Sequence, residues 1–259
     1  MLDFGQIQSQ YPESLHGFKR AIVREYLQYK ILQGLFESNL ASKISFLGGT
    51  ALRIVYGNQR FSEDIDLDNF GLSWEDFESL ISDVVRLLEL EGFVIEADKV
   101  AKSAFHCMIK FPDVLYNHGL SPLPQEKIRI QIDTVSQGFN YRPDVKILNK
   151  FDVFTRIRVT PLSILLSQKI YTAVNRTRPK GRDFYDIIFL LGQTKPNYDF
   201  LKLKIGVDSP GQLREWLFEH IDDVDFDVLT KDVENFLLMS NEKQRVTLFR
   251  EYWEQADLG

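Results

Sequence analysis

The sequence of 259 residues predicts an α+β fold with two domains, a sheet-containing domain over residues 1–158 and a helical domain over residues 159–259. Two observations lead to this prediction. Segments in which apolar and polar residues alternate, as in half-buried strands, are concentrated before residue 159. After it, apolar residues recur at three- and four-residue steps, which is typical of helices. A run of strands followed by a run of helices indicates an α+β architecture.

Periodicity and end signals define the elements of the first domain. Ser73 is a suitable N-cap, Asp76 completes a capping-box pattern, and Gly92 ends that helix. Pro112 to Pro124 reads as a loop because it contains three prolines and a glycine. In chain order, we expect a helix over 14–38, a strand over 43–47, a helix over 50–56, a strand over 64–70, a helix over 73–91, and strands over 93–97, 104–111 and 127–135.

The second domain is expected to be mostly helical. Thr160 reads as a cap and Pro161 as a first-turn proline, and together they begin a helix that runs to Asn175. The next helix covers residues 182–191. Three further helices are expected over 209–220, 225–238 and 241–255.

Composition excludes several classes of protein. The single cysteine, Cys107, excludes an intramolecular disulfide and fits a reducing compartment. No apolar run approaches the roughly 18–20 residues that a membrane helix needs. The N-terminus lacks a basic-then-apolar signal sequence. We therefore expect a cytoplasmic protein without a membrane partner.

The net charge of −6 is unevenly distributed and argues against indiscriminate nucleic-acid binding. Residues 197–259 carry 14 acidic and 7 basic side chains, so the rest of the chain is nearly balanced. Residues 169–182 contain basic side chains and no acidic one. Such a patch can bind phosphate, although a solvated helix end and loop would have the same composition. Its basic residues are Lys169, Arg176, Arg178, Lys180 and Arg182.

The most informative stretch is residues 47–68, LGGTALRIVYGNQRFSEDIDLD. Asp64 and Asp66 point to the same face of an extended strand because side chains alternate. Two carboxylates on one face favour a divalent cation between them, most plausibly Mg²⁺. The Gly48–Gly49 pair lets the backbone approach a ligand and begins a helix whose free N–H groups suit phosphate. A phosphate cradle with metal-binding carboxylates is the minimal equipment for nucleotidyl or phosphoryl transfer. The alternative is an edge strand with solvated acids.

This arrangement resembles the nucleotidyltransferase superfamily that includes DNA polymerase β. The superfamily signature is a hydrophobic residue, Gly, and Gly or Ser, followed by Asp-hydrophobic-Asp about ten residues later. Leu47, Gly48–Gly49 and Asp64–Asp66 match it with a slightly longer gap, and Asp68 matches neither motif carboxylate. The fuller pattern GGTALR…RFSEDIDLD is similar to the AbiEii toxin family of type IV toxin–antitoxin and phage-abortive infection systems, which includes the MenT toxins.

The resemblance covers residues 20–195 and implies a polymerase β-like domain, a mixed sheet flanked by helices, whose active-site cleft is completed by the helical domain. It implies Mg²⁺-dependent transfer of a nucleoside monophosphate from an NTP to an RNA acceptor, with a tRNA 3′ end as one candidate. It also implies a cognate antitoxin protein or repressor encoded nearby.

Asp133 is the expected third carboxylate of the site. The segment KIRIQIDTV alternates isoleucines with Arg129, Gln131 and Asp133, so one strand face is apolar and the other polar. In the resembled superfamily, a later strand beside the Asp-x-Asp strand donates an acid that helps hold the metal and activates the attacking hydroxyl. Asp133 fits that position, unless it merely caps a turn. Asp113 and Asp144 fit less well because they flank prolines.

Gly48, Gly49 and Thr50 are expected to cradle the triphosphate. Ser62 resembles the serine of the family's RxSxDxD pattern, which makes it a candidate phosphate ligand. Arg60 is a candidate charge partner in the same nucleotide-binding set. For Ser62 and Arg60, a structural hydrogen bond would explain the residue equally well.

Lys169 lies within the apolar stripe of its helix, four residues after Leu165 and four before Ala173. A lysine that faces the interior needs an anion or must extend to solvent. A nucleotide phosphate is a natural partner, and the resembled family carries a functional lysine in this helix. We therefore expect Lys169 to serve both catalysis and nucleotide binding.

Arg182, Asp183 and Asp186 begin the next helix and resemble the family's RD-x-x-D ending. We expect Arg182 to bind the nucleotide and Asp183, in preference to Asp186, to be the functional acid. Acids near a helix N-terminus are stabilising in any case, so a purely structural role stays open.

Two other functions stay open. A transferase of the same fold could nucleotidylate a protein side chain. A non-catalytic nucleotide-binding module could retain the acids by descent, although the intact set of Asp64, Asp66 and Asp133 argues against it. The four histidines are too scattered in the sequence to read as a zinc site.

Overall fold

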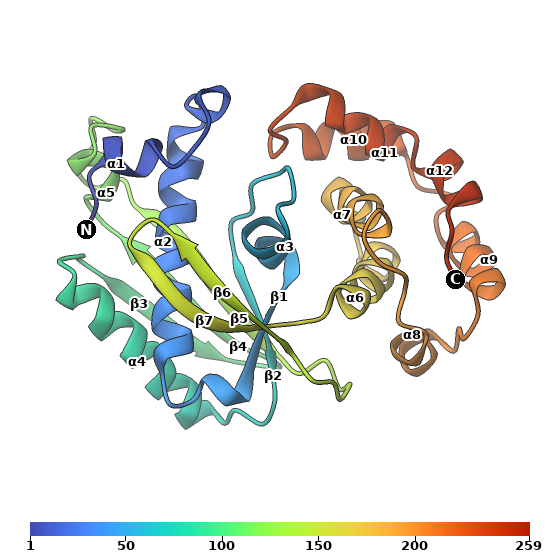
Figure 1. The fold of residues 1–259 in the computed structure, drawn as a ribbon, viewed down its shortest axis with the longest axis horizontal. Coiled ribbons are helices and arrows are strands. Elements are labelled where there is room, and N and C mark those ends of the chain that lie inside the picture. Colours follow the sequence, from blue (N-terminus) through green and yellow to red (C-terminus); the bar gives the residue numbers. More distant parts are fainter. The chain divides into compact units, whose positions relative to one another are not determined.

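The computed structural model describes residues 1–259 and divides the chain into two compact units. Unit 1 comprises Met1–Tyr56 and Phe61–Val159, and unit 2 comprises Gly57–Arg60 and Thr160–Gly259. Figure 1 shows the helices and strands of both units. No helix is long and apolar enough to cross a membrane.

Unit 1 is built on one seven-stranded mixed sheet with the order β3-β4-β5-β2-β1-β7-β6 (Figure 1). Two neighbouring pairs, β1 with β7 and β2 with β5, are parallel, and the other pairs are antiparallel. The strands are β1 (Ile44–Leu47), β2 (Ile65–Asn69), β3 (Glu96–Ala101), β4 (Phe105–Phe111), β5 (Ile128–Val135), β6 (Asp144–Lys150) and β7 (Val153–Val159).

The core of unit 1 lies between the apolar face of the sheet and two long helices. The helices α2 and α4 pack against each other, α2 also packs on β7, and α4 on β3 and β4. In β5 the isoleucines are buried on this face, whereas Gln131 and Asp133 lie half-buried on the opposite face. The helices are α1 (Phe4–Gln8), α2 (Lys19–Glu37), α3 (Gly48–Tyr56), α4 (Trp74–Leu90) and α5 (Val114–Asn117).

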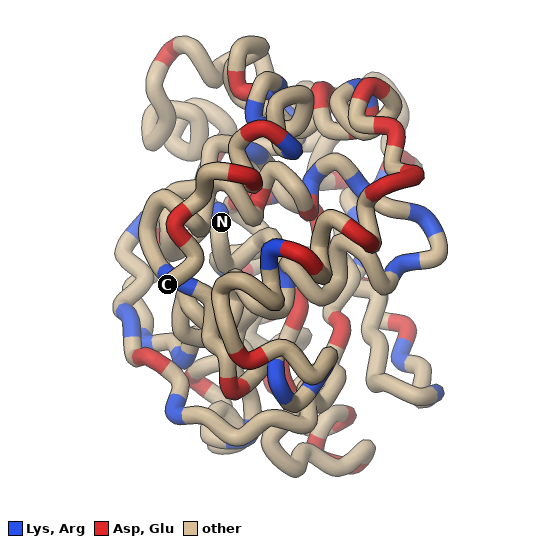
Figure 2. Tube along the Cα trace, turned by 90° about the vertical axis from the view of Figure 1, so that its right-hand side faces the viewer, with Lys and Arg blue, Asp and Glu red and all other residues tan.

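Unit 2 is helical apart from the short segment Gly57–Arg60. The helix α7 packs against α6, α10 and α11, and the Phe184 ring lies 5.1 Å from that of Phe226 and 4.9 Å from that of Phe249. The helices are α6 (Leu162–Asn175), α7 (Gly181–Leu191), α8 (Tyr198–Ile205), α9 (Pro210–His220), α10 (Phe226–Glu234), α11 (Gln244–Thr247) and α12 (Phe249–Gln255). Figure 2 shows acidic residues spread along the trace of these helices.

The predicted α+β class is confirmed, and several elements differ from prediction. The strand expected over 93–97 is wrong in position. The Phe93 ring packs on that of Phe111 at 5.8 Å, and pairing with β4 places β3 at Glu96–Ala101. The hairpin of β6 and β7 was not expected, although β7 alternates buried and exposed residues along its whole length.

Helix ends also differ from expectation. Ser73 caps α4 with Asp76 in a full capping box, as predicted. Thr160 is not a cap, because the N-cap of α6 is Pro161, which makes no side-chain capping bond. The helix expected over 14–38 begins at Lys19, after a separate short 3₁₀ turn. The short helices α1, α5 and α8 were not expected, and the helices expected over 225–238 and 241–255 are broken into α10, α11 and α12.

Candidate active site

Gly48 brings the backbone against Asp66, the second motif carboxylate, in unit 1. The strand β1 ends at Leu47, whose Cα pairs with Asp66 of β2. The chain then turns through Gly48, which has a φ of 78° and begins α3. A Cβ at Gly48 would lie 2.0 Å from Oδ2 of Asp66. Glycine is therefore required here both for the left-handed conformation and for the space that the Asp66 carboxylate occupies.

Thr50 connects α3 to the other motif carboxylate. Its side chain is fully buried, and its hydroxyl donates a hydrogen bond to the backbone carbonyl of Asp64. The hydroxyl of Thr50 thus positions the strand that carries the acids. The first turn of α3 contains no acidic residue, so its N–H groups keep the partial positive charge that suits an anion.

Gln28 of α2 holds the residues just before the acids. Its side-chain amide donates hydrogen bonds to the backbone carbonyls of Ser62, at 3.0 Å, and Glu63, at 2.9 Å. The Gln28 side chain is buried, whereas Ser62 is half-buried. The Gln28 side chain therefore fixes the chain that enters β2. No sequence motif had pointed to this residue.

The three carboxylates predicted for the metal come from neighbouring segments of the sheet. Asp64 directly precedes β2, Asp66 lies within it, and Asp66 pairs in register with Asp133 of the parallel strand β5. Side chains of paired residues project to the same face, so Asp66 and Asp133 are lateral neighbours. All three are half-buried. As the side chains stand, no group of three or more His, Cys, Asp or Glu residues is placed to hold a metal ion.

Asp133 is instead held by two protein donors. His106 of β4 pairs in register with Asp133, and its Nδ1 lies 2.7 Å from Oδ1 of that carboxylate. The Gln131 amide donates to both oxygens, at 2.7 and 3.0 Å. His106 belongs to none of the sequence motifs described above. The signal that could have found it is the alternation of β4, which places His106 on the polar face of the sheet.

Asp68 has a structural role. Its side chain is buried, with an exposed fraction of 1%, and accepts hydrogen bonds from the backbone N–H of Gln137 at 2.9 Å and the Tyr141 hydroxyl at 2.8 Å. These bonds tie the segment after β5 to β2. Asp68 therefore differs from Asp64 and Asp66, the two half-buried acids that precede it in the sequence.

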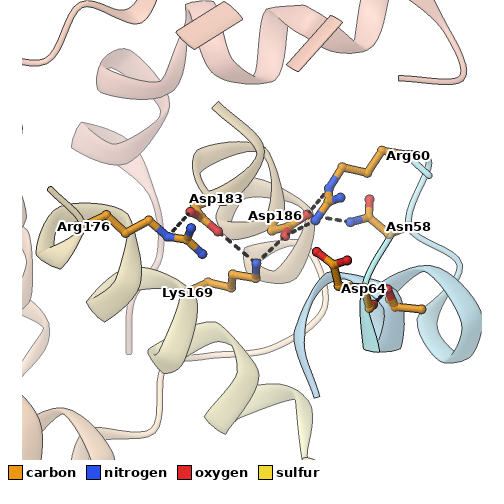
Figure 3. Close-up of polar contacts among 8 residues, drawn as sticks. Asn58, Arg60, Asp64, Lys169, Arg176, Asp183 and Asp186 are labelled. Atoms are coloured by element: carbon orange, nitrogen blue, oxygen red, sulfur yellow. Dashed lines mark hydrogen bonds and ion pairs between the residues drawn. The ribbon is translucent and has the colours of Figure 1, made fainter. Parts of the chain in front are cut away.

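Unit 2 contains a separate buried cluster around Asp186 of α7 (Figure 3). Arg60 binds Asp186 in a bidentate manner, from Nε at 2.7 Å and from Nη2 at 2.6 Å. Asn58 donates to the same carboxylate at 2.8 Å. The segment containing Asn58 and Arg60 also pairs with the chain after α10, since Arg60 forms an isolated bridge with Leu237. The sequence candidate Arg60 thus has its charge partner in Asp186.

Lys169 of α6 lies between the two acids of α7. Its Nζ is 3.0 Å from Oδ1 of Asp183 and 2.9 Å from Oδ2 of Asp186. Arg176 approaches Asp183 Oδ2 at 3.1 Å without hydrogen-bond geometry. The anion predicted for Lys169 is therefore present within the protein. Arg182 is half-buried and makes no hydrogen bond or ion pair.

The charges of this cluster stabilise one another. Burial by itself lowers the pKa of Arg60 and Lys169, but the neighbouring carboxylates outweigh it, so both pKa values are raised. Burial raises the pKa of Asp186, but Arg60 and Lys169 outweigh it and lower that pKa to about 2. All three groups are consequently charged across the physiological range.

The family model described as nucleotidyl transferase AbiEii toxin, type IV TA system, matches residues 30–254. No curated protein sequence matched. The structure of JHP933 from Helicobacter pylori is similar with a TM-score of 0.59 and 18% identity, over 91% of this chain and 90% of that one. A second Helicobacter pylori structure, provisionally described as a nucleotidyltransferase, has a TM-score of 0.57 and 18% identity, over 92% and 98%. At this identity, the two structures support the fold alone.

Proposed function

Because the chain belongs to the AbiEii family of nucleotidyltransferase toxins of type IV toxin–antitoxin systems, we propose that it transfers a nucleoside monophosphate from an NTP to an RNA acceptor with the help of Mg²⁺. The observation that carries the proposal is the convergence of three features in unit 1. Gly48 makes room for the Asp66 carboxylate, Thr50 fixes Asp64, and Asp66 pairs in register with Asp133.

The donor set fits a hard divalent cation. Asp64 and Asp66 supply carboxylate oxygens, which are the ligands that Mg²⁺ prefers, and Gly48 leaves the space that the Asp66 carboxylate needs. We propose that these two acids hold the ion, with Asp133 as the third ligand once a nucleotide is bound. A bound Mg²⁺ would neutralise phosphate charge and orient the triphosphate.

The residues of unit 1 divide into a donor side and an acceptor side. The N-terminus of α3, with Gly48, Gly49 and Thr50, binds the phosphates through backbone N–H groups, and half-buried Ser62 adds a hydroxyl. Asp133 accepts the proton of the acceptor hydroxyl. The hydroxyl oxygen then forms a bond to the α-phosphorus, and the bond to pyrophosphate breaks.

The strand order supports this division. The helix α3 follows β1 on one side of β2, whereas β5 and β4 lie on the other side. On that second side, the open face of the sheet holds a groove of about 320 Å³, bordered by His106, Gln131 and Met108, with Lys102 and Asp98 at its edge. We place the acceptor over this groove, next to Asp133.

For unit 2 we propose a supporting role in nucleotide binding. Lys169 is held charged by Asp183 and Asp186, so its positive charge is already paired within the protein. Arg60 is bound to Asp186, and Arg182 is half-buried with no ion pair, which leaves Arg182 as the available phosphate ligand in this unit. The family also supports an antitoxin partner, which we propose to be encoded with the toxin.

The test is incubation of the purified protein with total tRNA, Mg²⁺ and each α-labelled NTP, beside an Asp66→Asn variant of nearly the same shape. Label on RNA with the wild type alone would support the proposal. Label on protein would transfer support to the alternative, modification of a protein side chain. If no label appears on any acceptor but calorimetry detects NTP binding, the proposed catalysis is overturned and a binding module is favoured.

A further inference from the structure

We propose that His106 and Gln131 are positioning residues that hold the Asp133 carboxylate in place for the acceptor hydroxyl. This inference rests on the function proposed above and concerns the same site. It assigns roles to two side chains that neither the sequence motifs nor the family pattern selected. His106 and Gln131 are called the Asp133 clamp below.

The clamp restrains the carboxylate from two directions. His106 lies opposite Asp133 across the antiparallel β4–β5 pair, with Nδ1 at 2.7 Å from Oδ1. Gln131 lies two residues before Asp133 on the same face of β5 and donates to Oδ1 at 2.7 Å and to Oδ2 at 3.0 Å. A carboxylate offers about four lone-pair positions. The clamp uses three of them, so the carboxylate is fixed in orientation.

The clamp also counters electrostatic repulsion. Asp66 and Asp133 are paired in register on neighbouring strands, which lie about 4.8 Å apart, and like charges so placed repel. His106 comes from β4, on the far side of β5 from β2. Its N–H therefore stabilises the Asp133 charge from the side away from Asp66. Because a carboxylate only accepts hydrogen bonds, the Nδ1 that faces it is the donor.

The side chains of the clamp and of Asp133 lie outside the buried core that holds the two strands together. The side chains of His106 and Asp133 are exposed to fractions of 33% and 27%, whereas the residues that alternate with them, Cys107 and Ile132, are fully buried. The core face of both strands does not depend on the clamp. Arg129 is exposed on the same face of β5, two residues before Gln131, and does not border the groove, so it is a matched neighbour that makes no bond to Asp133.

The test compares His106→Leu, His106→Gln and Gln131→Leu with the control Arg129→Leu, using the labelled-NTP assay and calorimetry with Mg²⁺ and NTP. We expect His106→Leu and Gln131→Leu to lower kcat about 10- to 100-fold, as losses of outer-shell partners do. The KM and Kd for the NTP should stay within about twofold, because the clamp does not touch the donor side. His106→Gln, which keeps an N–H donor, should recover most of kcat, and Arg129→Leu should match the wild type.

The outcomes separate the two proposals. A wild-type protein without transfer to any acceptor overturns both. An active wild type with an unchanged kcat in His106→Leu and Gln131→Leu overturns the clamp alone. A parallel fall of kcat in Arg129→Leu, or a loss of NTP binding in the clamp variants, would show a general disturbance of the sheet and would also overturn the clamp. If His106→Leu does not fold, Gln131→Leu and His106→Gln decide by the same criteria.

Discussion

Replacing Gly48 by alanine tests the packing of the Gly-Gly turn against Asp66. An L-residue in the left-handed conformation found at Gly48 costs about 1–2 kcal/mol. In addition, the new Cβ would lie 2.0 Å from Asp66 Oδ2 and 2.8 Å from its Cγ, whereas ordinary contacts begin at 3.4 Å. The Asp66 carboxylate would therefore have to move by more than about 1 Å, a displacement that can cost about 100-fold in rate.

Gly57→Ala is the matched control for this prediction. Gly57 has a φ of 74°, close to the 78° of Gly48, but a Cβ there would meet no atom within 4 Å. Both variants should lose a similar 1–2 kcal/mol of unfolding free energy in urea, measured by circular dichroism. Only Gly48→Ala should lose about 100-fold in nucleotidyl transfer. Transfer by Gly48→Ala at a rate near that of Gly57→Ala would refute the reasoning that the turn exists to accommodate Asp66.

Three further predictions concern buried charges. Asp186→Asn should destabilise unit 2 by about 3–5 kcal/mol, because Arg60 and Lys169 lose a buried partner. The control Asp208→Asn removes an exposed pair with Lys202 and should cost less than about 1 kcal/mol. The urea midpoints of both variants would test this. Because the pKa of Asp186 is lowered to about 2 from its ordinary 3.8, its contribution to stability is complete above pH 3.8 and is lost as the pH falls towards 2. The urea midpoint of the wild type should therefore fall more steeply over that window than that of Asp186→Asn. Glu25→Gln should lower the free energy of unfolding of unit 1 by about 3 kcal/mol, because buried Glu25 binds Arg53 at 2.7 Å and Lys150 at 2.9 Å. Equal urea midpoints for the variant and the wild type would contradict this role.

Local patterns predicted most of the fold because they depend on neighbours in the sequence. The alternation of Ile128, Ile130 and Ile132 marked β5, and the Ser73–Asp76 capping box marked the start of α4. Long-range pairing decided the rest. The position of β3 follows from its register with β4. The residues 93–97 alone do not show that the Phe93 ring packs on Phe111 and that the strand begins only after it.

The residues of the candidate site were likewise predictable from local patterns, whereas their pairing was not. The Asp-x-Asp strand and Asp133 were predictable, because a motif and an alternating strand are visible in one sequence. Their register was not, since Asp66 and Asp133 are 67 residues apart and meet only through the parallel β2–β5 pair. His106 was missed for the same reason. For Lys169 the need for an anion was predictable from its apolar stripe, but the choice between a bound phosphate and the acids of α7 required their distances.

The unusual length of the motif gap has a structural explanation. Asp64 lies 15 positions after Gly49, a longer step than the ten or so of the superfamily pattern. The segment Gly57–Arg60 within that gap belongs to unit 2, while Tyr56 and Phe61 on either side belong to unit 1. Without those four residues the gap would be 11, close to the general pattern.

The four additional residues carry the groups that bind Asp186. Asn58 and Arg60 both donate to that carboxylate, and Arg60 also bridges to Leu237. The chain therefore leaves the catalytic sheet between the Gly-Gly helix and the Asp-x-Asp strand, is anchored in the helical unit by a buried bidentate ion pair, and returns. Only three residues of chain, Phe61, Ser62 and Glu63, lie between Arg60 and Asp64. This short covalent path connects the buried cluster around Asp186 in unit 2 with the proposed metal ligand Asp64 in unit 1.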